Sequence, residues 1–298
     1  MSGTGSGTGG APANEPPIVV KVGGAKAVDP VGTVGDVAHL VANGREVVVV
    51  HGGSTVVDET LERLGIEPEY VESASGVAGR FTDAETMEAF SMAMAGKLNT
   101  ELTARFRSAG VDGGLLSGAR KSAVRVVEDD KRKIRRGDHS GRIESVNAAL
   151  LAALLTDGYT PVVSPPTAGD EGDGEVTPVN ADADRAAAAV AGALGADLVL
   201  LTDVSGVYAD PDDPETLIDA AATPDELAAV EDAAEGFMGK KVMAAREALS
   251  GGSGRVVIAD ANLRDPVVAA LGGAGTTIGR SALGGESESD AETGGEIA

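Results

Sequence analysis

Two glycine turns constrain the fold of this chain more than any other feature. Gly23-Gly24 follows a β-branched apolar run at 18–20 and Lys21, and Gly52-Gly53 follows a second such run at 47–50. Each turn precedes a segment of helical periodicity, so we expect strand–turn–helix units whose backbone N–H groups face an anion. Glycine suits these positions because the backbone must approach a phosphate closely. One such turn is typical of an ordinary strand-to-helix connection; the pair favours an anion site.

Composition excludes several kinds of site. The 298 residues include no Cys and 3 His, which excludes disulfides, thiolate metal sites and a cysteine nucleophile, and leaves little for a histidine zinc site. Hydrophobic residues make up 42% and aromatic residues 2%, so we expect a core of Val, Leu, Ala and Ile. The net charge of −23 argues against nonspecific nucleic-acid or anionic-membrane binding.

The acidic excess and the absence of long apolar runs give two further expectations. Dense Asp and Glu with few Lys fit a protein from a high-salt cytoplasm, so we interpret the composition as halophilic. No charged-then-apolar signal segment opens the chain, and no run approaches the 18 apolar residues of a membrane span, so we expect a cytoplasmic protein without membrane contact.

Strand and helix patterns alternate along the chain, which predicts an α/β fold. We expect a mainly parallel central sheet, flanked by helices on both faces, with ligands at the carboxyl ends of the strands. The predicted divisions are a disordered leader at 1–16, an N-terminal lobe at 17–172, a C-terminal lobe at 173–280 and a disordered acidic tail at 281–298. The Gly/Asp-rich stretch 167–174 sets the lobe boundary. We also predict one long helix at 84–109 and an exposed hairpin at 123–136.

Polar residues gather where predicted strands end. They are Lys21, Asn180, Asp182, Asp184, Asp203, Lys240 and Lys241. A helix cap is a fair alternative for Asp182, and a solvated pair is the alternative for the two adjacent lysines. No Walker A pattern, Ser/His/Asp arrangement or HExxH motif occurs, so any nucleotide site is not a P-loop.

Six segments, in this order, resemble the amino-acid kinase family. They are Lys21-Val-Gly-Gly24, His51-Gly-Gly53, Arg80-Phe-Thr-Asp83, Asn180-Ala-Asp-Ala-Asp184, Leu201-Thr-Asp-Val-Ser-Gly206 and Lys241-Val-Met-Ala-Ala245. They span about 17–280 and are most similar to the acetylglutamate kinase branch. Within it the chain most resembles archaeal and Thermus-type kinases that act on glutamate or 2-aminoadipate attached to a small acidic carrier protein, LysW. It departs at Ser54, where many relatives have a third Gly, and at Gly239, where a basic residue is common.

The resemblance implies an ATP-dependent kinase that forms an acyl phosphate on a side-chain carboxylate, in arginine or lysine biosynthesis. It assigns catalytic roles to Lys21, Lys241 and Asp184. Gly23, Gly24, Asp203 and Lys241 would contact ATP, with Mg²⁺ on the phosphates and no dedicated protein metal site. Gly52, Gly53, Arg80 and Asn180 would bind the substrate, with Arg80 clamping the α-carboxylate bidentately.

A basic segment departs from the acidic character of the chain. Nine basic residues lie between Arg120 and Arg142, diluted by four acidic residues. The expected docking surface for the acidic carrier is the hairpin set Lys131, Arg132, Lys133, Arg135 and Arg136, since opposite charges steer association. A solvated hairpin is the alternative.

The sequence leaves several alternatives open. The first is an N-acetylglutamate kinase acting on the free molecule, and the second is a non-catalytic amino-acid sensor or scaffold on the same fold. A kinase for UMP or isopentenyl phosphate would need a site for a phosphorylated acceptor, which Arg80-Phe-Thr-Asp83 fits less well. Glutamate and aminoadipate differ by one methylene and are not separated by the sequence. We expect a homodimer.

Overall fold

The computed structural model describes residues 15–23, 30–72, 78–111, 113–116, 120–121, 125–128, 131–134, 137–170 and 176–284. The predicted leader up to residue 14 and the predicted tail from residue 285 lie outside this part of the chain. Gly24, Arg135 and Arg136 also lie outside it. The backbone of β8 is described, and the side chains of Lys131, Arg132 and Lys133 lie outside the described part of the structure.

The core of the molecule is an eight-stranded sheet, as the alternating patterns predict. In spatial order its strands are β14 (Ala220–Ala221), β16 (Thr276–Gly279), β15 (Arg255–Asp260), β13 (Asp197–Thr202), β1 (Ile18–Val22), β2 (Val47–His51), β10 (Thr160–Val163) and β5 (Gly113–Leu116). All neighbours pair in parallel except β15 and β16, which are antiparallel. The predicted fold class, a mainly parallel central sheet, is confirmed.

Helices cover both faces of this sheet, because successive strand residues point to opposite sides. On β1, Ile18 and Val20 pack with residues of α1 (Pro30–Ala42), α4 (Asn99–Ser108) and α9 (Pro266–Leu271). Val19 faces the other way and packs with residues of α5 (Ala148–Thr156), α6 (Ala183–Leu194), α7 (Pro224–Ala233) and α8 (Gly236–Gly251). The strands are therefore buried on both sides, as their continuous apolar runs indicate.

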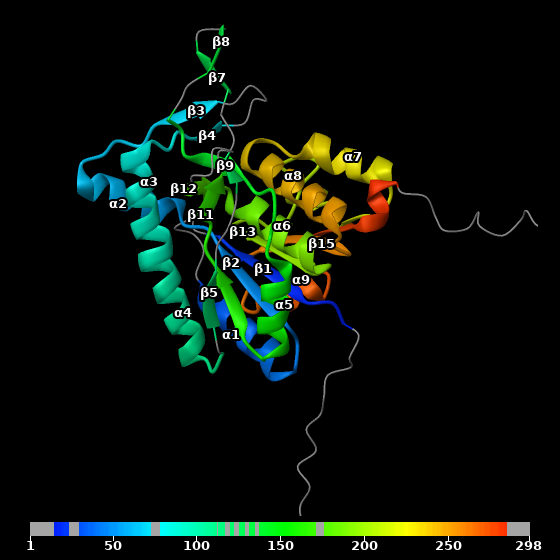
Figure 1. The fold of residues 1–298 in the computed structure, drawn as a ribbon. Coiled ribbons are helices and arrows are strands. Elements are labelled where there is room, and N and C mark those ends of the chain that lie inside the picture. Colours follow the sequence, from blue (N-terminus) through cyan, green and yellow to red (C-terminus); the bar gives the residue numbers. More distant parts are fainter. Residues whose placement is uncertain are drawn as a thin grey trace, which may run out of the picture.

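Three small sheets lie beyond the central one and gather at one end of the molecule (Figure 1). The first has the order β11 (Thr167–Asp170), β12 (Val176–Ala181), β9 (Ser140–Arg142) and β6 (Arg120–Lys121). The second pairs β3 (Tyr70–Glu72) with β4 (Ala78–Arg80). The third is the predicted hairpin, β7 (Arg125–Glu128) with β8 (Lys131–Ile134), which projects furthest from the body. Because β11 and β12 pair across 171–175, the predicted lobe boundary falls inside a hairpin, and the lobe division stays a prediction.

The long helix predicted at 84–109 is interrupted. It consists of α3 (Ala84–Ser91), a π-helical segment at Met92–Leu98, and α4. At the end of the π-helical segment the Asn99 N–H donates to the carbonyl of Met94, five residues earlier. Met94 and Leu98 of the wide turn lie against Gly53, where an added Cβ would be 2.4 Å from Met94 Sδ and 2.3 Å from Leu98 Cδ1. The wide turn therefore meets the glycine turn that precedes α2 (Ser54–Leu64), a tertiary contact that the apolar periodicity does not reveal.

Within the described part of the chain, no helix is long and apolar enough to cross a membrane.

Helices α6 and α8 pack closely through two glycines. A Cβ added at Gly192 of α6 would lie 2.9 Å from the Gly251 Cα of α8. That distance is shorter than any ordinary contact between two carbon atoms. The neighbouring atom belongs to the backbone of α8, so it could not move without shifting the helix. The separation of the two helices is therefore set by hydrogen atoms at Gly192 and Gly251.

We predict opposite effects for two helical glycines. Gly192→Ala should lower the free energy of unfolding by about 1–3 kcal/mol, because overpacking forces α6 and α8 apart. Gly35→Ala, in α1 with no atom within 4 Å of the new Cβ, should be neutral or stabilising by up to about 1 kcal/mol. Denaturant unfolding of both variants measures this, and equal effects would contradict the packing argument.

Candidate active site

The predicted catalytic residues meet in one ion cluster. The Lys21 Nζ of β1 lies 2.7 Å from the Asp184 Oδ1, and the Lys241 Nζ of α8 lies 2.9 Å from the Asp184 Oδ2. Their side chains are 8%, 12% and 10% exposed for Lys21, Lys241 and Asp184. Each carboxylate oxygen has its own ammonium partner, and the three groups together carry a net charge of +1.

The Asp184 carboxylate remains charged near neutral pH. Burial acts to raise the pKa of Asp184. The Lys21 and Lys241 ammonium groups lower it by more than burial raises it, so that the pKa is about 2. Asp184 is therefore ionised at any pH near neutrality. A buried net positive charge of this kind attracts an anion strongly, because it is poorly screened by water.

The local fold explains how Asp184 reaches both lysines. Asp182 caps the N-terminus of α6 and accepts the N–H groups of Asp184 at 2.9 Å and Arg185 at 3.1 Å. The capping alternative for Asp182 is therefore correct. Because Asp182 satisfies the backbone of this first turn, the Asp184 side chain is left for the lysines. Arg185, the next residue, joins α6 to α8 by a two-point ion pair with Glu247, at 2.9 and 2.5 Å.

The second glycine turn differs in part from the prediction. The Gly52 N–H donates to the Val22 carbonyl at 2.9 Å and so extends the pairing of β1 with β2. That amide is engaged in this structure. Gly53 precedes α2, whose first-turn N–H groups have no acceptor inside the helix. A glycine is required at position 53 because a Cβ there would collide with Met94 and Leu98 of the π-helical segment, so this requirement is independent of any ligand.

His51 and Asn99 form a buried link that the sequence did not single out. The Asn99 Nδ2 lies 3.2 Å from the His51 Nε2 and donates to the Val162 carbonyl at 3.1 Å, and the His51 Nδ1 lies 3.2 Å from the Gly52 carbonyl. Burial lowers the pKa of His51, so the ring is neutral, with its hydrogen on Nδ1 because Nε2 accepts from Asn99. The link fixes the Gly52 peptide against α4. Only the adjacency of His51 to the glycines hints at it in the sequence.

Arg80 is held by residues that the sequence did not identify. Its Nη2 lies 2.6 Å from the Asp58 Oδ1 of α2 and 3.1 Å from the Tyr70 hydroxyl, and its guanidinium lies 5.2 Å from the centre of the Tyr70 ring. The Arg80 side chain is 7% exposed. Its Nη1 is buried and has no hydrogen-bond partner within the described residues. Buried nitrogens without an acceptor are rare in folded proteins, and this one is able to donate to an oxygen atom of a ligand.

Asn180 connects Arg80's neighbourhood to the ion cluster. The Asn180 Nδ2 donates to the Thr82 Oγ1 at 3.0 Å, and the Ser140 Oγ donates to the same oxygen at 3.2 Å. Asn180 is four residues before Asp184, so the two backbones lie at most about 14 Å apart. Asn180 is thus hydrogen-bonded to the residue two positions after Arg80 and lies four positions before Asp184 in the chain.

The remaining predicted residues, Asp203 and Lys240, have partners outside the ion cluster. Asp203 follows β13, is exposed, and accepts a hydrogen bond from Thr202 at 3.1 Å. Lys240 lies 5.5 Å from the ring centre of Phe237 and does not join the ion cluster formed by Lys241. In the described residues, no group of three or more His, Asp or Glu side chains could hold a metal ion. The donor set of the cluster, two ammonium groups, fits phosphate oxygens.

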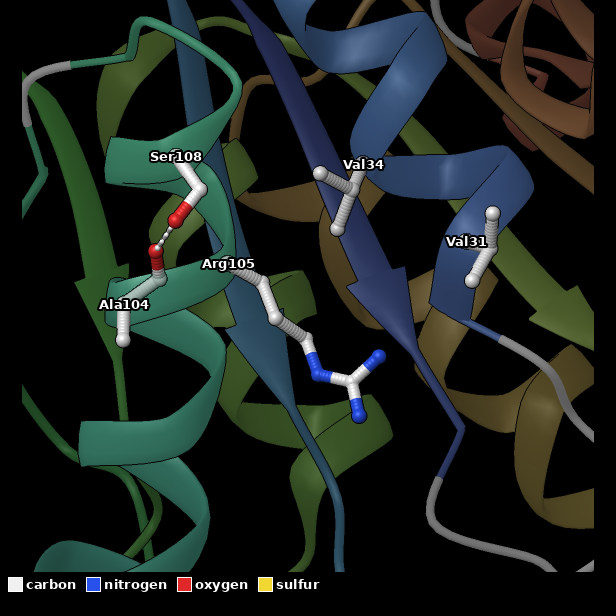
Figure 2. A pocket seen from close by; sticks show the side chains of 5 residues that line it. All are labelled: Val31, Val34, Ala104, Arg105 and Ser108. Carbon is white, nitrogen blue, oxygen red and sulfur yellow. Dashed lines mark hydrogen bonds between the residues drawn. The ribbon is translucent and has the colours of Figure 1, made fainter.

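A groove of about 310 Å³ lies elsewhere, between α1 and α4 (Figure 2). It is lined by Val31, Val34, Ala104, Arg105 and Ser108, and the Ser108 hydroxyl turns to the Ala104 carbonyl at 2.9 Å. None of the predicted site residues lines it.

Comparison with known proteins agrees with this geometry. Residues 16–260 match the amino acid kinase family. The LysW-aminoadipate kinase of Deinococcus radiodurans is 42% identical over 270 residues, covering 88% of this chain and 91% of that protein. The acetylglutamate kinase of Methanopyrus kandleri is 40% identical over 251 residues, covering 80% of this chain and 93% of that protein.

A solved structure supports the fold. The N-acetylglutamate synthase from Neisseria gonorrhoeae, in complex with coenzyme A and N-acetyl-glutamate, superposes with a TM-score of 0.70 at 25% identity. The match covers 89% of this chain and 59% of that longer one. With its own motifs, its parallel sheet and these relatives in agreement, this chain belongs to the amino acid kinase family.

Proposed function

We propose that this protein transfers the γ-phosphoryl group of ATP to the side-chain carboxylate of glutamate or 2-aminoadipate attached to a small acidic carrier protein. The observation that carries the proposal is the buried Lys21–Asp184–Lys241 cluster. It offers two ammonium groups at the carboxyl end of the central strand β1. The Deinococcus radiodurans relative, a LysW-aminoadipate kinase, supports the carrier-linked substrate.

The chemistry needs charge cancellation more than proton transfer. A glutamate carboxyl has a reference pKa of about 4.3 and is already ionised at neutral pH. No general base is required, and the obstacle is the repulsion between two anions. Lysines whose mutual repulsion is balanced by one carboxylate suit this task, because they are in position before the reaction begins.

Each residue of the cluster has a distinct proposed role. Lys21 contacts the transferring phosphoryl group, Lys241 contacts the phosphate end that departs, and Asp184 holds both ammonium groups in place. Mg²⁺, bound to the phosphates of ATP, would neutralise further charge. Gly23 and Asp203 lie at the ends of β1 and β13, the two adjacent strands, where the nucleotide would approach.

The acyl substrate would lie between the cluster and Arg80. The Arg80 Nη1 is open to an oxygen of the substrate, and Asn180 orders the same end through Thr82. Since the Arg80 Nη2 is engaged by Asp58 and Tyr70, a bidentate clamp through Nη1 and Nη2 does not fit this arrangement. We therefore assign Nη1 the contact with the α-carboxylate.

The acetylglutamate kinase from Methanopyrus kandleri supports a second candidate, phosphorylation of free N-acetylglutamate. The two candidates share the chemistry and differ in what is attached to the α-nitrogen. Steady-state kinetics with ATP, on carrier-linked glutamate, carrier-linked 2-aminoadipate and free N-acetylglutamate, tests the proposal. We expect kcat/KM for a carrier-linked substrate to be at least tenfold the value for the free molecule. The reverse order would favour the second candidate.

We predict that Lys21→Ala and Lys241→Ala each lower kcat by at least about a hundredfold, the scale of losing one electrostatic donor. Asp184→Asn should be comparably impaired, since it leaves two cations adjacent without their anion. Lys240→Ala, next to Lys241 but outside the cluster, is the matched control and should retain kcat within about threefold. Because the pKa of Asp184 is about 2, assays of the wild type down to about pH 5 should not reproduce the Asp184→Asn defect.

We predict that Lys131→Glu/Lys133→Glu slows turnover of a carrier-linked substrate and spares free N-acetylglutamate. Both lysines belong to β8, one strand of the hairpin. Charges at the edge of an interface act mainly on the association rate, so the loss should fall on kcat/KM and shrink at high salt.

The matched control is Arg105→Glu/Arg107→Glu on α4, which changes the net charge equally at exposed positions outside the hairpin. Equal losses in both double variants would assign the effect to net charge alone. Equal losses on free and carrier-linked substrates would mean that the hairpin shapes the active site itself.

A further inference from the structure

We propose that Asp58 determines which substrate chain length this enzyme accepts, by anchoring Arg80 to α2 at a fixed distance from the reacting end. The inference rests on the proposed function and extends it to a specificity-determining residue. Neither Asp58 nor its partner Tyr70 belongs to the predicted catalytic or substrate-binding set.

The anchoring contact is close and has three components. The Arg80 Nη2 lies 2.6 Å from the Asp58 Oδ1, the same nitrogen donates to the Tyr70 hydroxyl at 3.1 Å, and the guanidinium stacks on the Tyr70 ring at 5.2 Å. Nη2 therefore has two partners, one of them charged. The ion pair, the hydrogen bond and the ring contact together restrain the planar guanidinium, and with it the direction of Nη1.

Arg80 needs this anchor because its strand is not part of the central sheet. It ends β4, which pairs with β3 alone in a two-stranded sheet. Asp58 belongs to α2, which follows directly from the β2 strand of the central sheet and packs on α3 and the π-helical segment through Val57 and Leu61. The ion pair thus ties a peripheral sheet to an element built on the core.

Helix α2 connects both ends of the substrate site. Its N-terminus follows the Gly52-Gly53 turn, and the Gly52 N–H donates to the carbonyl of Val22, the residue after Lys21. Asp58 lies four residues after Ser54, which is about 6 Å along a helix axis. Because an α-helix does not stretch, the ion pair sets the distance between the open Arg80 Nη1 and the N-terminus of α2.

A fixed distance makes the site sensitive to one methylene. An extra methylene lengthens a substrate by roughly one carbon–carbon bond, about 1.5 Å. Misplacement of a reacting group by about 1 Å can cost on the order of a hundredfold in rate. A site with Arg80 held by Asp58 should therefore distinguish glutamate from 2-aminoadipate, and a site with a free Arg80 should accommodate both.

The experiment measures kcat/KM of the full-length protein for carrier-linked glutamate and carrier-linked 2-aminoadipate, and compares their ratio among variants. We expect at least tenfold discrimination by the wild type and less than about threefold by Asp58→Asn, which keeps the shape and removes the charge. Tyr70→Phe keeps the ion pair and should retain most of the discrimination. The matched control is Glu231→Gln, which breaks the remote 2.7 Å pair with Arg246 and should leave the ratio unchanged.

Structural damage is separated from loss of selectivity by the KM for ATP, which should stay within about twofold in every variant. Asp58→Ser provides a second variant if Asp58→Asn does not fold. The inference is overturned if Asp58→Asn keeps the wild-type ratio, even with both KM values raised equally, or if the wild type shows no discrimination.

Failure of the proposed function would look different. It would appear as a wild type that phosphorylates neither carrier-linked substrate but is active on free N-acetylglutamate. The length comparison is then made with free N-acetylglutamate and N-acetyl-2-aminoadipate, and the same ratios support or overturn the role of Asp58.

Discussion

The active site depends on one carboxylate shared by two ammonium groups. Asp184 is almost fully buried, and a charge in that position is unfavourable unless it is paired. Lys21 at 2.7 Å and Lys241 at 2.9 Å provide the pairing and leave one positive charge in excess. In a chain of net charge −23, this small positive centre has to be enclosed by the fold, because exposed carboxylates would otherwise cancel its attraction for a phosphate.

The surrounding architecture follows from bringing these three residues together. Lys21 requires that β1 lie in the middle of the sheet, with its carboxyl end facing the start of α6. Asp184 requires that another residue cap α6, which Asp182 does. Lys241 requires α8 to approach α6 closely, which the hydrogen atoms at Gly192 and Gly251 permit. The Arg185–Glu247 pair, between Asp184 and the glycine contact, then sets how the two helices align.

Residues at strand ends were predictable from the sequence, and residues whose roles come from tertiary contacts were not. Strand periodicity predicted the parallel sheet, which is confirmed, and polar residues near the strand ends led to the candidates Lys21 and Asp184, which lie in one ion cluster. It did not reveal Asp58 or Tyr70. In the sequence, a carboxylate on an amphipathic helix and a tyrosine near a strand are typical surface residues, and only the tertiary structure shows that both contact Arg80. The π-helical segment at Met92–Leu98 was not predicted from the sequence, for a similar reason. Its apolar residues fit an uninterrupted helix, and its local geometry accompanies the contact of Met94 and Leu98 with Gly53, which is distant in the sequence.

In the proposed site the two ends belong to different parts of the fold, so the residues proposed for the chemistry are separate from those proposed for specificity. The reacting end is built from β1, α6 and α8, which pack on the central sheet and are buried in its largest apolar cluster. The proposed substrate end lies on β4 and β12, in sheets outside the central one, and Arg80 at the end of β4 forms an ion pair with Asp58 of α2. A change in β3, β4 or α2 can therefore alter which carboxylate is accepted while the ion cluster remains intact. That separation fits a family in which relatives of this chain near 40% identity are named for different acyl substrates, since the same cluster can serve any carboxylate that the outer sheets bring within reach.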